Sequence, residues 1–156
     1  VARFFLDFTV EESCGKCTPC RIGNKRLLEL LNKITEGKAT EKDLQTLQTL
    51  GKVIKDTALC GLGQTSPNPV LSTLDNFYDE YVEHVRDKTC RAKQCKSLLT
   101  YYINPDTCIG CHLCAKNCPA DAITGLPRKP HTVLPEKCIK CGMCMAPCKF
   151  NAISVC

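Results

Sequence analysis

The chain has 156 residues, a formal net charge of +5 and 15 cysteines, close to one residue in ten. This length allows one ordinary domain or two small ones, and small domains bury little apolar surface, so we expect the cysteines to stabilise the fold. Eleven of them stand in three tight runs with two or three residues between neighbours, a spacing that favours ligands around metal centres and argues against the disulfide framework of a secreted protein.

The first ten residues, VARFFLDFTV, lack the basic segment and the following apolar run that mark a signal peptide. No stretch of the sequence reaches the roughly 18 uninterrupted apolar residues of a membrane span. We therefore expect a soluble, cytoplasmic protein. An apolar opening without a start methionine is typical of the interior of a longer chain.

The first cysteine run is Cys14, Cys17 and Cys20, three thiols with two residues between neighbours and no fourth cysteine nearby. A four-cysteine iron-sulfur cluster needs one more ligand. Cys60, in the segment LCGLGQ, is the isolated cysteine of the first half, so we expect the intervening helices to return it to this run.

Apolar residues recur at helical spacing in three stretches of the first half, so each predicted helix has one face to bury. Gly37 stands where a C-terminal helix cap belongs, and Thr40 with Asp43 forms a capping-box-like start for the next helix. Residues 1–88 therefore predict a small helical bundle. The helical stretches are 22–34, 41–59 and 70–86.

Cys90 and Cys95 lie between the two halves, in a linker that we place at residues 89–100. Together with His84 and the terminal Cys156 they offer three thiolates and one imidazole, a ligand set suited to tetrahedral zinc. We therefore predict a structural zinc hinge. The alternatives are free or buried cysteines with a surface histidine, a disulfide, or another metal.

The second half contains an internal repeat with an offset of 30 residues: CIGCHLCAKNCPADAI at 108–123 matches CIKCGMCMAPCKFNAI at 138–153. Such a duplication predicts two equivalent half-units related by a pseudo-twofold axis, each with a short strand, a cluster loop and a short helix. The proline-rich segment 125–135 is the predicted turn between them.

Each copy of the repeat carries the pattern C-x2-C-x2-C-x3-C. The first three thiolates surround one iron-sulfur cubane, and the fourth completes the other cluster, so the ligation is crossed. A zinc ribbon would instead use well separated C-x2-C pairs. The predicted 4Fe-4S ligand sets are Cys108, Cys111, Cys114 and Cys148 for one cluster, and Cys138, Cys141, Cys144 and Cys118 for the other.

Two histidines and several basic residues near the cysteines receive milder interpretations. His112 lies in a cluster loop whose four-cysteine complement is full, and His131 lies in the proline-rich turn, so both are predicted at the surface rather than as ligands. The basic side chains are interpreted as solvated charge or as groups that raise a reduction potential. They are Lys16, Arg21, Lys137, Lys140 and Lys149.

The formal net charge counts cysteines as neutral and so leaves out the negative charge of clusters and thiolate ligands. Three clusters with their ligands, at roughly −2 each, bring the chain from +5 to about −1. The charge therefore does not support a nucleic-acid partner.

These motifs resemble two known families. From Tyr101 to Val155 the chain is similar to bacterial two-cluster ferredoxins, except that Lys149 follows Cys148 where a proline is usual. The segments ESCGKCTPCR and ALCGLGQTSPNP resemble the C-terminal bundle of the NADH-binding flavoprotein subunit of respiratory complex I, and the corresponding subunits of NAD(P)-linked hydrogenases and formate dehydrogenases. This likeness covers about Phe4 to His84. It implies that Cys14, Cys17, Cys20 and Cys60 bind the 4Fe-4S cluster that takes electrons from FMN.

A two-cluster ferredoxin segment after such a bundle resembles the flavoprotein subunit of multimeric, electron-bifurcating iron-iron hydrogenases that couple NAD(P)H and ferredoxin. The resemblance implies a mainly α helical bundle followed by a small α+β ferredoxin-like domain at 101–156. It also implies FMN and NAD(P) sites upstream of Val1, and partners that include a hydrogenase catalytic subunit, a small 2Fe-2S subunit and ferredoxin. The glycine-rich motifs of those upstream sites are not in this sequence, so we expect it to transfer electrons without hydride chemistry.

The predicted function is a one-electron relay through three 4Fe-4S clusters, between a flavin and NAD(P)H site upstream and partner subunits of a hydrogenase-type oxidoreductase. One alternative is the same relay in a formate dehydrogenase or complex I relative. Another is a redox-sensing iron-sulfur binding module, against which two adjacent clusters argue because sensing needs only one.

Overall fold

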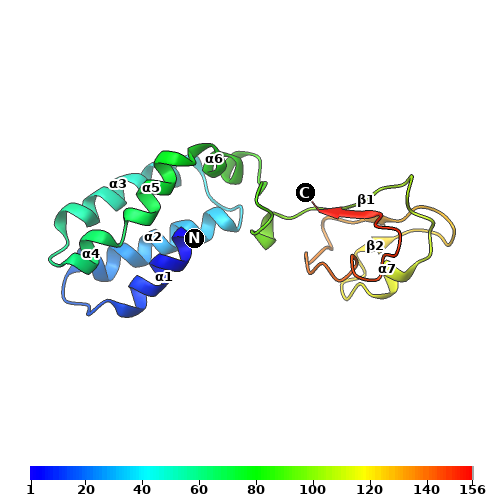
Figure 1. The fold of residues 1–156 in the computed structure, drawn as a ribbon, viewed down its shortest axis with the longest axis horizontal. Helices are drawn as coiled ribbons and strands as arrows, with labels where there is room; N and C mark the ends of the chain where they lie inside the picture. Colours follow the sequence, from blue (N-terminus) through cyan, green and yellow to red (C-terminus); the bar gives the residue numbers. More distant parts are fainter. Residues whose placement is uncertain (156) are drawn as a thin grey trace. The chain divides into compact units, whose positions relative to one another are not determined.

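The computed structural model describes residues 1–155, which separate into two compact units, one spanning residues 1–89 and the other beginning at Cys90. The first unit is helical, and the short strands lie in the second (Figure 1). Within the described residues, no helix has both the length and the apolar character that crossing a bilayer requires.

The first unit packs its helices around one apolar core, to which the side chains of α1, α2, α3, α5 and α6 contribute. Leu6, Leu27, Leu47 and Ile54 are fully buried there. A π-helical turn, labelled η1, leads directly into α2. The elements are α1 Ala2–Glu12, η1 Pro19–Gly23, α2 Asn24–Thr35, α3 Glu41–Thr57, α4 Gly61–Thr65, α5 Asn68–Asn76 and α6 Tyr78–Arg86.

The predicted caps between α2 and α3 are present. Gly37 adopts a φ of 73°, and its N–H donates to the carbonyl of Ile34 at 3.1 Å, which ends α2. At the start of α3 the carboxylate of Asp43 accepts hydrogen bonds from the backbone N–H of Thr40 at 2.7 Å and from its hydroxyl at 2.8 Å. These bonds hold the pKa of Asp43 below its usual value.

Helical periodicity located the helices better than it located their breaks. The stretch predicted as one helix at 70–86 is two helices, because Phe77 has φ −135° and ψ 38° and interrupts the ladder. The Thr73 and Tyr81 hydroxyls meet at 2.8 Å across this break. Helix α1 was not predicted, since it buries only a narrow stripe that includes Leu6 while Phe4 and Phe8 stay exposed.

The second unit is built from short elements around a small core that contains cysteines. Strands β1 and β4 pair antiparallel with Tyr102 opposite Ser154, and β2 and β3 pair antiparallel with Ile123 opposite Val133. β1 lies before the first copy of the repeat and pairs with β4 at the end of the second copy. β2 at the end of the first copy pairs with β3, which lies before the second copy. The elements are a 3-10 turn Lys96–Leu98, β1 Tyr101–Ile103, α7 Leu113–Lys116, β2 Ile123–Thr124, β3 Thr132–Val133 and β4 Ile153–Val155.

The 30-residue repeat reappears in the backbone conformation. Gly110 and Lys140 both have positive φ, at 71° and 59°, and Asp121 and Asn151 share a φ of 47°. The hydrogen bonds repeat as well: the N–H groups of Cys118 and Cys148 donate to carbonyls three residues earlier, both at 3.1 Å. The two half-units thus have equivalent loops, as the repeat predicts.

The half-units differ in one predicted element. The first has the short helix α7, whose end is closed by the N–H of Asn117 donating to the carbonyl of Leu113 at 3.1 Å. The second has only a turn at the same place. Its equivalent of Asn117 is Pro147, which has no N–H to donate, so the closing bond cannot form.

Candidate metal centres

The first cysteine run lies beside the start of α4. Cys20 is buried within η1, and Cys60 is the residue immediately before α4. A Cβ built on Gly63 would lie 3.2 Å from the Cβ of Cys20 and 3.6 Å from its sulfur, so α4 approaches this cysteine closely. The fold therefore places α4, which begins one residue after Cys60, beside Cys20 of the run.

The Cys17 thiol is another link between these segments. Its pKa is lowered chiefly by a backbone hydrogen bond from Leu59 and next by one from Cys20. Leu59 is the neighbour of Cys60, so backbone N–H groups from both sides of the site favour a thiolate. Such donors suit a cysteine that binds metal as the anion.

A polar network surrounds Cys20 and was not anticipated from the sequence. The hydroxyl of Ser13 lies 3.2 Å from the Cys20 sulfur, and the Nδ2 of Asn24 donates to the same sulfur at 3.5 Å. The hydroxyl of Ser66 donates to the Oδ1 of Asn24 at 2.8 Å. A signal was present in the sequence, because Asn24 occupies a position on the apolar stripe of α2, four residues after a predicted ligand.

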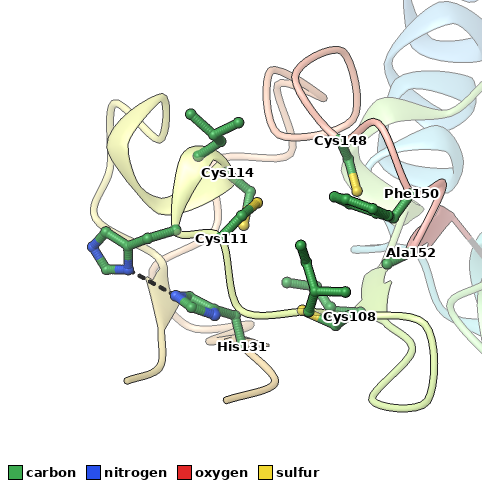
Figure 2. A pocket seen from close by; sticks show the side chains of 11 residues that line it. Cys108, Cys111, Cys114, His131, Cys148, Phe150 and Ala152 are labelled. Atoms are coloured by element: carbon green, nitrogen blue, oxygen red, sulfur yellow. Dashed lines mark hydrogen bonds between the residues drawn. The ribbon is translucent and has the colours of Figure 1, made fainter. Parts of the chain in front are cut away.

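One cavity of the second unit is lined by the four cysteines of a predicted crossed set. Figure 2 shows Cys108, Cys111 and Cys114 from the first copy of the repeat and Cys148, from the end of the second copy, around the same space. Apolar side chains, among them Phe150, complete the lining. Four thiols converging on one cavity fit a group that needs four sulfur ligands.

A second cavity holds the other predicted set. It is lined by Cys118 together with the three cysteines at 138, 141 and 144, and Tyr101, Ile139 and Met143 surround them. In each cavity, three cysteines come from one repeat copy and the fourth from the other. The lining of each cavity therefore includes the four cysteines that the spacing groups together.

The third cysteine of each run in the second unit is buried, which disfavours a free thiolate. Burial is the main cause that raises the pKa of Cys114, and the nearby Cys108 and Cys111 raise it further. Burial likewise raises the pKa of Cys144, as do Cys138 and Cys114. Several thiolates at such a spacing repel one another, so their joint ionisation needs the positive charge of a metal core.

The prediction that His131 lies at the surface is wrong. Its side chain is only 2% exposed, and its Nδ1 lies 3.1 Å from the carbonyl of Lys129, which can only accept a hydrogen bond. Its Nε2 lies 2.7 Å from the Nδ1 of His112, which is half-buried (Figure 2). The imidazole is buried because it packs over Gly125, where a Cβ would come within 2.6 Å of the ring.

Gly110 is required by the geometry of its cluster loop. It has a φ of 71°, and a Cβ there would lie 2.4 Å from the backbone nitrogen of Lys129. Gly142 also has positive φ, at 76°, but among the described residues a Cβ there would meet only the side chain of Tyr101, whose hydroxyl lies at 3.0 Å. The first loop is therefore the more tightly confined of the two.

Three of the four predicted zinc ligands come together. The candidate ligand atoms of His84, Cys90 and Cys95 all lie within 4.8 Å of one another. The Nδ1 of His84 lies 2.6 Å from the carbonyl of Glu80, so this nitrogen carries the proton and Nε2 keeps its lone pair. The fourth predicted ligand, Cys156, lies outside the described residues.

The basic side chains near the cysteines are partly engaged. Lys140 donates to the backbone carbonyl of Ser97. Beside this bond lies an open groove lined by Lys96, Ile139, Lys140 and the exposed Cys141, among others. The groove therefore places positive charge next to a predicted cluster ligand.

Comparison with known proteins assigns both units. Residues 1–84 match the family model of the NADH-ubiquinone oxidoreductase-F iron-sulfur binding region, and residues 102–155 match that of the 4Fe-4S dicluster domain. The chain is 60% identical over 131 residues to the NADP-reducing hydrogenase subunit HndC of Solidesulfovibrio fructosivorans, which covers 84% of this chain and 27% of that protein.

Two further relatives match between half and three fifths of the chain. The NAD-reducing hydrogenase HoxS subunit alpha of Cupriavidus necator is 44% identical over 52% of the chain and 14% of its own length. The NADH-quinone oxidoreductase of Streptomyces coelicolor has an F subunit that is 40% identical over 60% of the chain and 21% of its own length.

A solved structure of a hydrogenase is also similar to this chain. A crystal structure of an NAD+-reducing NiFe-hydrogenase in the H2-reduced state superimposes with a TM-score of 0.52 at 32% identity, covering 55% of this chain and 15% of that one. The chain spans about a quarter or less of the length of the curated relatives described here. With its first unit matched by the family model and its second by a dicluster domain, the chain belongs to the NADH-ubiquinone oxidoreductase-F iron-sulfur binding region family, and the relatives described here are subunits of NAD(P)-reducing hydrogenases and of an NADH-quinone oxidoreductase.

Proposed function

We propose that the chain relays electrons one at a time through three 4Fe-4S clusters, between a flavin and NAD(P)H site upstream and partner subunits of an electron-bifurcating, hydrogenase-type oxidoreductase. The observation that carries this proposal is the pair of cavities in the second unit, each lined by four cysteines drawn from both repeat copies. A third set in the first unit, Cys14, Cys17, Cys20 and Cys60, is supported by the family match over residues 1–84.

Bound 4Fe-4S clusters supply one-electron redox chemistry with little movement of the protein. The side chains of this protein hold and shield them. In the first cavity Ile103, Phe150 and Ala152 provide apolar walls beside the cysteines. The crossed ligand sets join the two half-units, so neither cluster loop can open without disturbing the other copy of the repeat.

The match to HndC favours a hydrogenase over the other systems. It extends over 84% of the chain, whereas the match to the Streptomyces coelicolor relative covers 60%. A complex I or formate dehydrogenase relative would use the same relay with other partner subunits. A redox-sensing module is the less economical proposal, because its response would need one cluster rather than three.

We also propose that His84, Cys90 and Cys95 bind a structural zinc ion. Tetrahedral zinc holds sulfur and nitrogen ligands roughly 3.6–3.8 Å from one another, so ligand atoms within 4.8 Å need only a small contraction. The His84 tautomer set by the Glu80 carbonyl offers Nε2 to the metal. The fourth ligand in this proposal is Cys156, and the linker is residues 89–100.

The charge of the second unit bears on its partners. From Cys90 onwards the sequence has nine lysines and arginines but three aspartates and glutamates. The groove lined by Lys96 and Lys140 beside Cys141 concentrates part of this charge near a cluster ligand. We propose that an acidic electron-carrier protein such as ferredoxin exchanges electrons here, in the cytoplasm, where a reducing environment preserves thiolate ligands.

Metal content and electron transfer test the proposal together. Protein purified without oxygen is expected to hold about twelve iron atoms and one zinc per chain. Cys60→Ser should lower iron to about eight while zinc stays, and Cys90→Ser should release zinc while iron stays. The reduced protein should also reduce an artificial one-electron acceptor over many turnovers. Retention of all the iron by Cys60→Ser would contradict the first ligand set, and failure of a fully loaded protein to reduce the acceptor would favour a sensing role.

A further inference from the structure

Asn24 is a polar residue in a core position. Its side chain is fully buried, and along α2 it shares one face with Leu27, Leu31 and Ile34, which are also buried. A helix stripe of this kind normally carries apolar side chains, because burying an amide costs free energy unless both its ends are hydrogen-bonded. The amide of Asn24 meets this condition through two specific partners.

The Cys20 sulfur fixes which end of the amide faces it, because a thiolate bound to metal can only accept hydrogen bonds. The carbonyl end, Oδ1, lies 2.8 Å from the buried Ser66 hydroxyl, whose single proton is shared between Oδ1 and the carbonyl of Gly63 at 2.9 Å. The Nδ2 end then donates to the Cys20 sulfur at 3.5 Å. The Ser13 hydroxyl lies 3.2 Å from the same sulfur. When Cys20 binds metal as a thiolate its sulfur can only accept, so Ser13 becomes a second donor.

The local backbone positions these donors. The π-helical turn Pro19–Gly23 ends where α2 begins, and the backbone N–H of Asn24 donates to the carbonyl of Cys20. A π-turn inserted in a helix is uncommon and occurs frequently at functional sites. Asn24 follows Cys20 by four residues, so its side chain lies on the same side of the helical backbone and reaches the Cys20 sulfur.

We propose that Asn24, oriented by Ser66 and assisted by Ser13, raises the reduction potential of the cluster bound by Cys20. This rests on the proposed function, in which Cys20 is a ligand of the first 4Fe-4S cluster. The cluster and its thiolates gain one negative charge when they accept an electron. Hydrogen bonds to a ligand sulfur stabilise the more negative state, and they act strongly in a buried site where water does not screen them.

This role differs from that of a merely structural asparagine. A structural residue would change stability when replaced and leave the potential of an intact cluster in place. Asn24, Ser13 and Ser66 are positioning residues that act through Cys20. Replacing any one of them should therefore lower the reduction potential of the cluster bound by Cys20. Each lost donor makes the reduced state less favourable.

The test is an anaerobic redox titration of the fully loaded protein, followed by electron paramagnetic resonance of each cluster. Asn24→Leu keeps the size of the side chain but cannot donate. We expect it to lower the ratio of reduced to oxidised first cluster about tenfold at a fixed potential, equivalent to about 59 mV for one electron. Ser13→Ala and Ser66→Ala should shift the ratio in the same direction by a smaller factor. The signals of the clusters in the second unit serve as an internal reference and should not move.

Asn32→Leu is the matched control, because Asn32 lies on the same helix and is only half-buried. It should leave all potentials unchanged. If the Asn24→Leu variant loses iron, the potential of its first cluster cannot be compared with that of the wild type. The two serine variants then test the proposal, since neither removes an apolar core contact. An unchanged potential of the first cluster in iron-replete Ser13→Ala and Ser66→Ala would overturn the proposal. A wild-type protein with only about eight iron atoms would instead overturn the first ligand set itself.

Discussion

Replacing Gly63 by alanine tests how closely α4 must approach the first cysteine site. A Cβ at this position would lie 2.6 Å from the Cβ of Ala58 and 3.2 Å from the Cβ of Cys20, and neither contact can be relieved by rotating a long side chain. Overpacking of this kind costs about 1–3 kcal/mol. Gly61, in the same five-residue helix, offers the matched substitution, because a Cβ there would have no neighbour within 4 Å.

Both substitutions add the same helix propensity, which favours alanine over glycine by up to about 1 kcal/mol. Gly61→Ala should therefore be neutral or slightly stabilising. The free energy of unfolding of Gly63→Ala should be lower than that of Gly61→Ala by the steric cost. For a unit of this size each kcal/mol shifts Tm by about 4–8 °C. Thermal unfolding followed by far-UV circular dichroism without oxygen, with iron content measured in parallel, compares the two. Equal Tm and equal iron would refute the close packing of α4 against Cys20.

Three more predictions follow from individual residues. Gly110→Ala should release about four iron atoms per chain while Gly142→Ala retains them, because a Cβ at Gly110 would lie 2.4 Å from the backbone nitrogen of Lys129; equal iron loss in the two variants would contradict this. Asp43→Ala should lower the stability of the first unit by about 0.5–1 kcal/mol at pH 7. Since hydrogen bonds from Thr40 depress the pKa of Asp43, this difference should be present above the unfolded pKa of about 3.9 and disappear as pH falls through the depressed value; a difference that persists in acid would contradict it. Cys95→Ser should release about one zinc per chain while iron stays, and zinc that remains would contradict the site at His84, Cys90 and Cys95.

Cysteine spacing predicted much of the site because it encodes geometry directly. Three thiols separated by two residues can surround one centre, and a fourth at x3 spacing is directed elsewhere, so the grouping of Cys148 with the first copy could be inferred without a structure. The cavity lined by Cys108, Cys111, Cys114 and Cys148 agrees with that grouping. Cys60 has no such spacing to place it, and its assignment to the first run stays a prediction that the family match supports.

The polar surroundings of the site were less predictable. The burial of His131 depends on its packing over Gly125, a contact that a proline-rich sequence does not reveal. The bond from Asn24 to Cys20 joins residues four apart, and the sequence marked it only by a polar residue at a core position. The break between α5 and α6 was also missed, because the sequence does not mark Phe77 as non-helical and only its dihedral angles interrupt the helix.

The central claim, that this chain carries three one-electron centres, is tested most directly by counting electrons. A coulometric titration of the protein purified without oxygen, with iron measured on the same sample, should yield about three electrons for about twelve iron atoms per chain. The Cys60→Ser variant should yield about two. Two electrons from the wild-type protein, with about eight iron atoms, would contradict the account by removing the cluster of the first unit and with it the connection to a flavin upstream.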